Sequence, residues 1–148
     1  MTTSAPAHTG IIPRGLIRGT LIGLAIFSAV SAIGGAIGLL LPGSLGVPLF
    51  VLDGSVFTDF VAPALILGIV VGGTQTVAAV AELRRTRLAT FWSAFAGFTM
   101  VVFIFVELAI MRGFSILHGI YFTTGLAQVA LVVALLGVLP GLVRAPRS

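Results

Sequence analysis

Four long apolar stretches, separated by short polar segments, dominate the sequence. They cover about residues 19–41, 60–82, 88–111 and 117–142. A helix needs about 20 apolar residues to cross a bilayer core of roughly 30 Å, and its backbone groups must be hydrogen-bonded within the segment. The pattern therefore predicts an all-α, four-helix transmembrane bundle in which successive helices cross the membrane up, down, up and down.

The four stretches predict one membrane domain over residues 14–143, with short tails at 1–13 and 144–148. Arg14 and Arg18 precede the first apolar stretch, as basic residues do in a signal peptide. The stretch is longer than the 7–15 apolar residues typical of such a peptide, and no convincing cleavage site follows it. We therefore expect the first span to be retained as a helix.

The arginines are distributed unevenly about these spans. Seven of them would lie on one side of a four-span protein: Arg14, Arg18, Arg84, Arg85, Arg87, Arg144 and Arg147. Arg112 would lie alone on the other side. Because basic residues accumulate in cytoplasmic segments, both termini and the turn at 84–87 are expected in the cytoplasm. The connection at 42–59, which carries three turn signals, would then cover the outer mouth of the bundle.

Composition supports a membrane location and excludes several chemistries. A mean hydropathy of +1.22 and only 8% charged residues exclude both a soluble globule and a disordered chain. Cysteine and lysine are absent, which excludes disulfides, thiolate metal sites and Schiff bases, and we expect neither a cofactor nor a metal. The net charge of +4 comes from arginines beside apolar segments, so no nucleic-acid partner is expected.

The use of arginine alone as the basic residue, with abundant alanine, glycine and valine, indicates a high-GC bacterial genome. The predicted location is therefore the plasma membrane of a bacterium, with the lipid bilayer as the first partner.

Small residues recur at four-residue spacing along three of the spans. These pairs are Gly19 and Gly23, Gly34 and Gly38, Gly68 and Gly72, and Ala130 and Ala134. Helices in lipid associate where small residues let their backbones approach. We expect these stripes to pack a monomeric bundle. The alternative is that one stripe, on the first span, forms a homodimer or binds another membrane protein.

Glu107 is the only ionisable residue well inside a span, and it lies five residues before Arg112. That places it about 7–8 Å below the outer end of the helix. If the last helix begins near Phe114, Glu107 and His118 would lie at equal depth on adjacent antiparallel helices. Such a carboxylate–imidazole pair can transfer a proton or bind a cation.

His118, Tyr121 and Gln128 share one side of the last span. Together with Glu107 they are expected to line a small pocket that opens outward beneath the connection at 42–59. The structural alternative is that Glu107 reaches the headgroups, or is protonated and bonded to a neighbouring helix. His118 would then lie at the interface, with the last helix beginning at Gly119.

Other polar residues have simpler expected roles. Asp53 and Asp59 would lie at the outer surface, where Asp59 can cap the second span and pair with Arg112. Both aspartates, Arg112 and Gln128 are candidate ligand-binding residues. Gln75 is expected to hydrogen-bond a serine or threonine on another helix, and Glu82 to be a solvated cytoplasmic helix end.

Several short motifs resemble a group of small bacterial four-span membrane proteins of unknown function. They are Leu41-Pro42-Gly43-Ser44, Phe57-Thr58-Asp59, Leu67-Gly68, the arginine turn, Glu107 and Leu117-His118-Gly119-Ile120-Tyr121. The resemblance covers nearly the whole chain. It implies the four-span topology and no activity.

Three functions fit these observations. The first is a non-enzymatic accessory subunit or lipid-associated bundle, favoured because the chain carries a single charge well inside a span. The second is a membrane-embedded isomerase or cyclase for a lipophilic substrate, with Glu107 as the acid and His118 and Tyr121 assisting. The third is a dimeric proton-coupled exporter that uses Glu107 as its coupling site.

Overall fold

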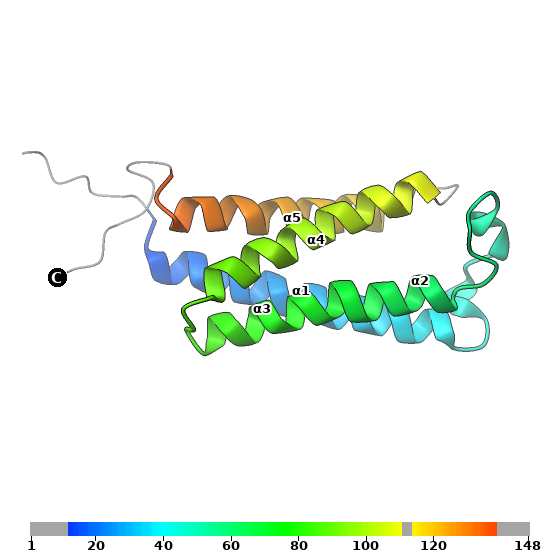
Figure 1. Cartoon of the computed structure of the whole chain (residues 1–148), viewed down its shortest axis with the longest axis horizontal. Coiled ribbons are helices and arrows are strands. Elements are labelled where there is room, and N and C mark those ends of the chain that lie inside the picture. Colours follow the sequence, from blue (N-terminus) through cyan, green and yellow to red (C-terminus); the bar gives the residue numbers. More distant parts are fainter. Residues whose placement is uncertain (1–11, 111–113, 139–148) are drawn as a thin grey trace, which may run out of the picture.

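The computed structural model describes residues 12–110 and 114–138, and in this part of the chain it is all-α (Figure 1). The first helix, α1, is Arg14–Leu40. The second is continuous from α2 (Val61–Leu65) through a π-helical segment, η3 (Ile66–Gly72), into α3 (Gly73–Leu83). The last two are α4 (Ala89–Ile110) and α5 (Ile116–Leu135). All four are long and apolar enough to cross a membrane.

The helix bounds follow the apolar stretches closely except at two ends. Helix α1 begins at Arg14, about one turn before the expected start at residue 19, immediately after Pro13. Helix α5 ends at Leu135, so the expected end at residue 142 is wrong. Gly137 adopts a φ of 74° there and its N–H bonds the Ala134 carbonyl, a left-handed turn that stops the helix.

Alanine is the commonest buried apolar residue between the helices. The centre of the bundle holds a cluster of Ala25, Ala78, Ala79 and Ala96. Glycine is required where α4 crosses α5, because a Cβ added to Gly97 would lie 3.0 Å from the Gly125 carbonyl oxygen. The backbones therefore touch directly at this crossing, which is how helices pack in lipid.

The small-residue stripe of the second helix packs inside the chain. A Cβ at Gly68 would lie 3.0 Å from the Ala36 Cβ, and one at Gly72 would lie 2.7 Å from Ile33, both on α1. A Cβ added to Gly19, Gly23 or Gly34 of α1 would meet no atom of another element within 4 Å among the described residues. The stripe at Gly68 and Gly72 thus holds the bundle together, whereas these glycines of α1 remain open.

The connection between α1 and α2 folds back over the end of α1. It contains two short 3-10 turns, η1 (Ser44–Gly46) and η2 (Leu49–Leu52), and it lies at one end of the bundle (Figure 1). Gly43, Gly46 and Gly54, one in each of the three turn signals, all have positive φ. Leu45 packs so closely on Gly38 that a Cβ there would lie 2.7 Å from it.

Candidate functional site

A cavity of about 400 Å³ lies between the helices beneath this connection. Apolar side chains from all four helices and the connection form most of its wall, including Leu45, Val47 and Val51 of the connection. The polar side chains among its described lining residues are Ser31, Glu107, Ser115, His118 and Tyr121. The cavity thus lies where the sequence predicted a pocket, and three of the four expected residues line it.

The π-helical segment η3 forms part of the wall through Leu67 and Val71. A π-helical turn carries extra residues per turn and is frequent at functional sites. The apolar periodicity of this stretch gave no sign of it. The segment turns two branched apolar side chains toward the cavity, opposite Met100 and Phe103 of α4.

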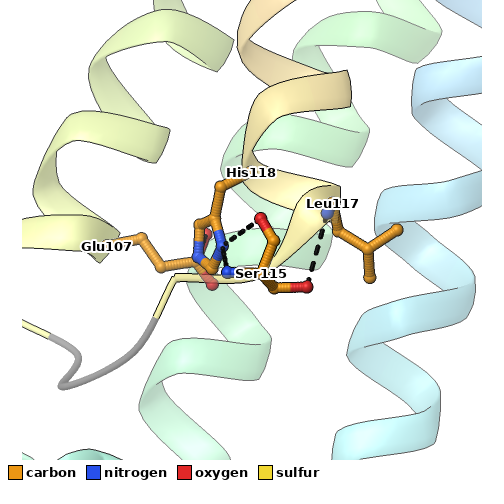
Figure 2. Close-up of polar contacts among 4 residues, drawn as sticks. All are labelled: Glu107, Ser115, Leu117 and His118. Atoms are coloured by element: carbon orange, nitrogen blue, oxygen red, sulfur yellow. Dashed lines mark hydrogen bonds and ion pairs between the residues drawn. The ribbon is translucent and has the colours of Figure 1, made fainter.

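Glu107 and His118 face each other across the hairpin of α4 and α5 (Figure 2). Glu107 Oε2 lies 3.5 Å from His118 Nε2, and the two side chains are 23% and 11% exposed. The backbone N–H of Ser115 donates to His118 Nδ1 at 3.0 Å. In the neutral tautomer that accepts this bond, the proton is on Nε2, which forms no hydrogen bond with the described residues and lies 3.5 Å from the carboxylate.

The capping box at the start of α5 fixes the orientation of the His118 imidazole. Ser115 is the N-cap, its Oγ accepts a hydrogen bond from the Leu117 N–H at 3.3 Å, and His118 completes a capping box from position N3. Glutamate or glutamine usually takes that position. The helix begins at Ile116, so the alternative start at Gly119 is wrong. His118 therefore has a structural role as well as a place in the cavity wall.

Tyr121 lies one turn further along α5 and also lines the cavity. Its ring stacks on Phe27 of α1, with ring centroids 6.2 Å apart, and packs against the cluster of Ala32, Val71 and Met100. These contacts hold the tyrosine between α1 and α4. Its position in the wall agrees with the expectation from helical spacing.

Gln128 does not line the cavity, and this expectation is wrong. It is fully buried and forms a reciprocal amide pair with Gln75, with N···O distances of 2.9 and 2.8 Å. Gln75 also donates to the Ala96 carbonyl at 3.3 Å. Gln75 therefore bonds another glutamine rather than a serine or threonine, because each amide offers both a donor and an acceptor to the other.

The remaining candidates lie away from the cavity or outside the described residues. Asp53 is exposed in the connection. Asp59 Oδ1 accepts a hydrogen bond from the N–H of Val61, the first residue of α2, at 2.9 Å, but the N-cap is Phe60, so the expected N-cap position of Asp59 is wrong by one residue. Arg112 is outside the described residues, so its pairing with Asp59 stays a prediction.

Glu82 is buried, and the expectation of a solvated helix end is wrong. It is only 1% exposed, accepts a hydrogen bond from Ser93 Oγ at 3.1 Å and lies 3.5 Å from Arg18 Nε. The spacing from Gly68 and Gly72 places Glu82 on the inward face of the second helix. That periodicity was the available signal, but the neighbouring arginines pointed to water.

Within residues 12–110 and 114–138, no three His, Asp or Glu side chains converge as metal ligands would. Comparisons with known protein families, curated proteins and solved structures found no match. The site must therefore be interpreted from its own geometry.

Proposed function

We propose that this chain is a non-enzymatic protein of a bacterial plasma membrane that binds one small amphiphilic, lipid-like molecule in the cavity beneath the connection. The four apolar helices support a four-span arrangement with alternating direction. The arginine distribution supports cytoplasmic termini and places the cavity toward the outer leaflet.

The observation that carries this proposal is the composition of the cavity wall. Binding sites for small molecules are typically about 300–1,000 Å³ and mostly apolar, with a few convergent polar groups. This cavity of about 400 Å³ has that character, with Glu107, His118 and Tyr121 as its polar groups. Its size suits a single short chain or ring system rather than a two-chain phospholipid.

The wall also suggests how the ligand would lie. The carboxylate of Glu107 accepts hydrogen bonds only, so the polar end of the ligand would carry a hydroxyl or amine donor. The apolar part would lie among Leu67, Val71 and Phe103, deeper in the bundle. A charge-assisted hydrogen bond contributes about 1.5–3 kcal/mol, which is enough to select such a ligand from the surrounding lipid.

Native mass spectrometry of the protein, extracted with its surrounding lipid, tests the proposal. We expect a lone chain carrying one molecule of constant mass, and a loss of occupancy of about tenfold or more in Glu107→Gln. Asp53→Asn is the matched control, because it removes a carboxylate that is exposed at the same end but does not line the cavity. Equal occupancy in both variants, or no bound molecule in the wild type, would refute the proposal.

One observation favours an enzyme as the second candidate. The imidazole is oriented by Ser115 and faces Glu107 at the edge of an apolar cavity, an arrangement that suits proton transfer to a lipophilic substrate. The same experiment separates the two functions. If Glu107→Gln retains a molecule that differs in mass or structure from the one on the wild type, the wild type converts its ligand.

The open glycines of α1 support the accessory role as well. Gly19 and Gly23 leave a flat strip on a lipid-accessible face, where a second copy or another membrane protein could approach closely. A stoichiometric second protein in the same mass spectrum would identify such a partner.

A further inference from the structure

A second hollow lies at the opposite end of the bundle, where α3 turns into α4. It is a groove of about 560 Å³. Its lining residues are Thr76, Val77, Val80, Ala81, Arg84, Thr86, Arg87, Leu88 and Trp92. None of these residues lines the cavity described above, so the groove is a separate feature.

The groove changes character along its length. Val77 and Val80 are 42% and 41% exposed, so their apolar surface is open to a neighbouring molecule. Arg84 and Arg87 lie in the turn that closes the groove at the end of the span, together with Thr86. An apolar slot that ends in two guanidinium groups is complementary to a molecule with an acyl chain and an anionic head.

The positive charge of the turn is not neutralised within the described residues. Glu82, the nearest acid in sequence, points into the bundle toward Ser93 and Arg18. No ion pair joins Arg84, Arg85 or Arg87 to a carboxylate in the part of the chain that the structure describes. The inward turn of Glu82 therefore leaves two arginines of the groove available to an external anion.

We propose that this groove binds an anionic glycerophospholipid from the leaflet on the side of the turn. Arg84 and Arg87 would hold the phosphate, since guanidinium groups bind phosphate oxygens with paired, charge-assisted hydrogen bonds. The acyl chain would lie along Val77 and Val80, with Trp92 at the level of the headgroup, where tryptophan is enriched.

Arg85 allows a bound lipid to be distinguished from general attraction to an anionic surface. Each arginine near such a surface raises binding roughly fivefold whatever its orientation. Arg85 is in the same turn and exposed, but it does not line the groove. If general attraction to the surface is responsible, loss of Arg84, Arg85 or Arg87 should weaken lipid binding equally. A site in the groove would depend only on Arg84 and Arg87.

The test is native mass spectrometry of the full chain from nanodiscs that contain equal amounts of phosphatidylglycerol and phosphatidylcholine. We expect the wild type to retain one phosphatidylglycerol after the remaining lipid has been stripped off. Arg84→Gln combined with Arg87→Gln should reduce that retained fraction about a hundredfold, since each charge-assisted hydrogen bond lost weakens binding by roughly tenfold or more. Arg85→Gln should leave it within about twofold of the wild type.

Val80→Trp provides a second variant that keeps every charge. It fills the apolar part of the groove from a half-exposed position and should also displace the retained lipid. If Arg85→Gln and Arg84→Gln, each made alone, lower the retained fraction of phosphatidylglycerol equally, general attraction to surface charge explains the binding and the site is refuted. Equal retention of phosphatidylcholine would refute the role of the arginines. Because neither arginine lines the outer cavity, failure here leaves the proposed function untouched.

Discussion

The two glutamates of the spans differ in what surrounds their carboxylates. Glu82 has a fully buried side chain that is held by Ser93 of α4 and Arg18 of α1, and neither hollow is lined by it. Glu107 lies beside one ionisable side chain of the described residues, His118, and faces a cavity of about 400 Å³. Burial alone therefore does not distinguish the two carboxylates, because only Glu107 borders a cavity.

From this contrast we expect different effects when Glu82 and Glu107 are replaced. At Glu82, a carboxylate on α3 ties α1 and α4 together, so its replacement should affect folding. At Glu107, the carboxylate joins only the two helices of one hairpin, so its replacement should affect binding more than folding. Each prediction below tests one side of this difference.

The largest effect is expected for Arg18→Ala. This change leaves the buried Glu82 without its cation, and breaking a buried ion pair costs about 3–5 kcal/mol. Because the Arg18 side chain is 37% exposed, we expect the lower end, a loss of about 3 kcal/mol. Unfolding in mixed detergent micelles measures it. Arg14→Ala, which removes an exposed arginine of the same helix, is the control and should change little.

A smaller effect is expected at the centre of the bundle, in Gln75→Leu. The change leaves the Gln128 amide buried without its partner, at a cost of about 1–3 kcal/mol. Adding Gln128→Leu should recover much of that loss, because the pair would then be apolar on both sides. If the double variant is less stable than Gln75→Leu alone, the hydrogen-bonded glutamine pair is not the main interaction at the centre of the bundle.

The smallest effects are expected at the cavity. His118→Ala removes the capping box of α5 and should destabilise the protein by about 1 kcal/mol. His118→Gln should retain most of that stability, since glutamine suits the N3 position. Glu107→Gln should change stability by less than about 1 kcal/mol, because glutamine has a similar shape, keeps an acceptor oxygen and leaves no buried charge without a partner. A loss for Glu107→Gln as large as that for Arg18→Ala would remove the distinction between the two glutamates.

Much of the fold was predictable because four stretches long and apolar enough to cross a bilayer leave few alternatives to helices. Apolar length predicts four helices, and the turn signals predict turns in the connection, where three glycines adopt positive φ. The proximity of Glu107 and His118 followed from counting residues across a short hairpin. Each of these expectations depends on neighbours along the chain.

The incorrect expectations for Gln128 and Glu82 have a common physical cause. Gln128 was expected in the cavity and Glu82 in water, yet both are buried in contacts with other helices. Helical spacing places residues on a common face, but it does not say which face turns inward or which helix lies opposite. In lipid, where apolar surface is favourable on every side, hydropathy cannot resolve that rotation.

The sequence by itself therefore determined the four apolar helices, their approximate bounds and the residues that share each face. Only the tertiary structure decided how far each helix is rotated and where the backbones touch. The contact of Gly97 with Gly125 and the packing of Gly72 on Ile33 bring the helices close at those points. The connection folds over one end of the bundle, and a cavity remains beneath it because no side chain fills that space.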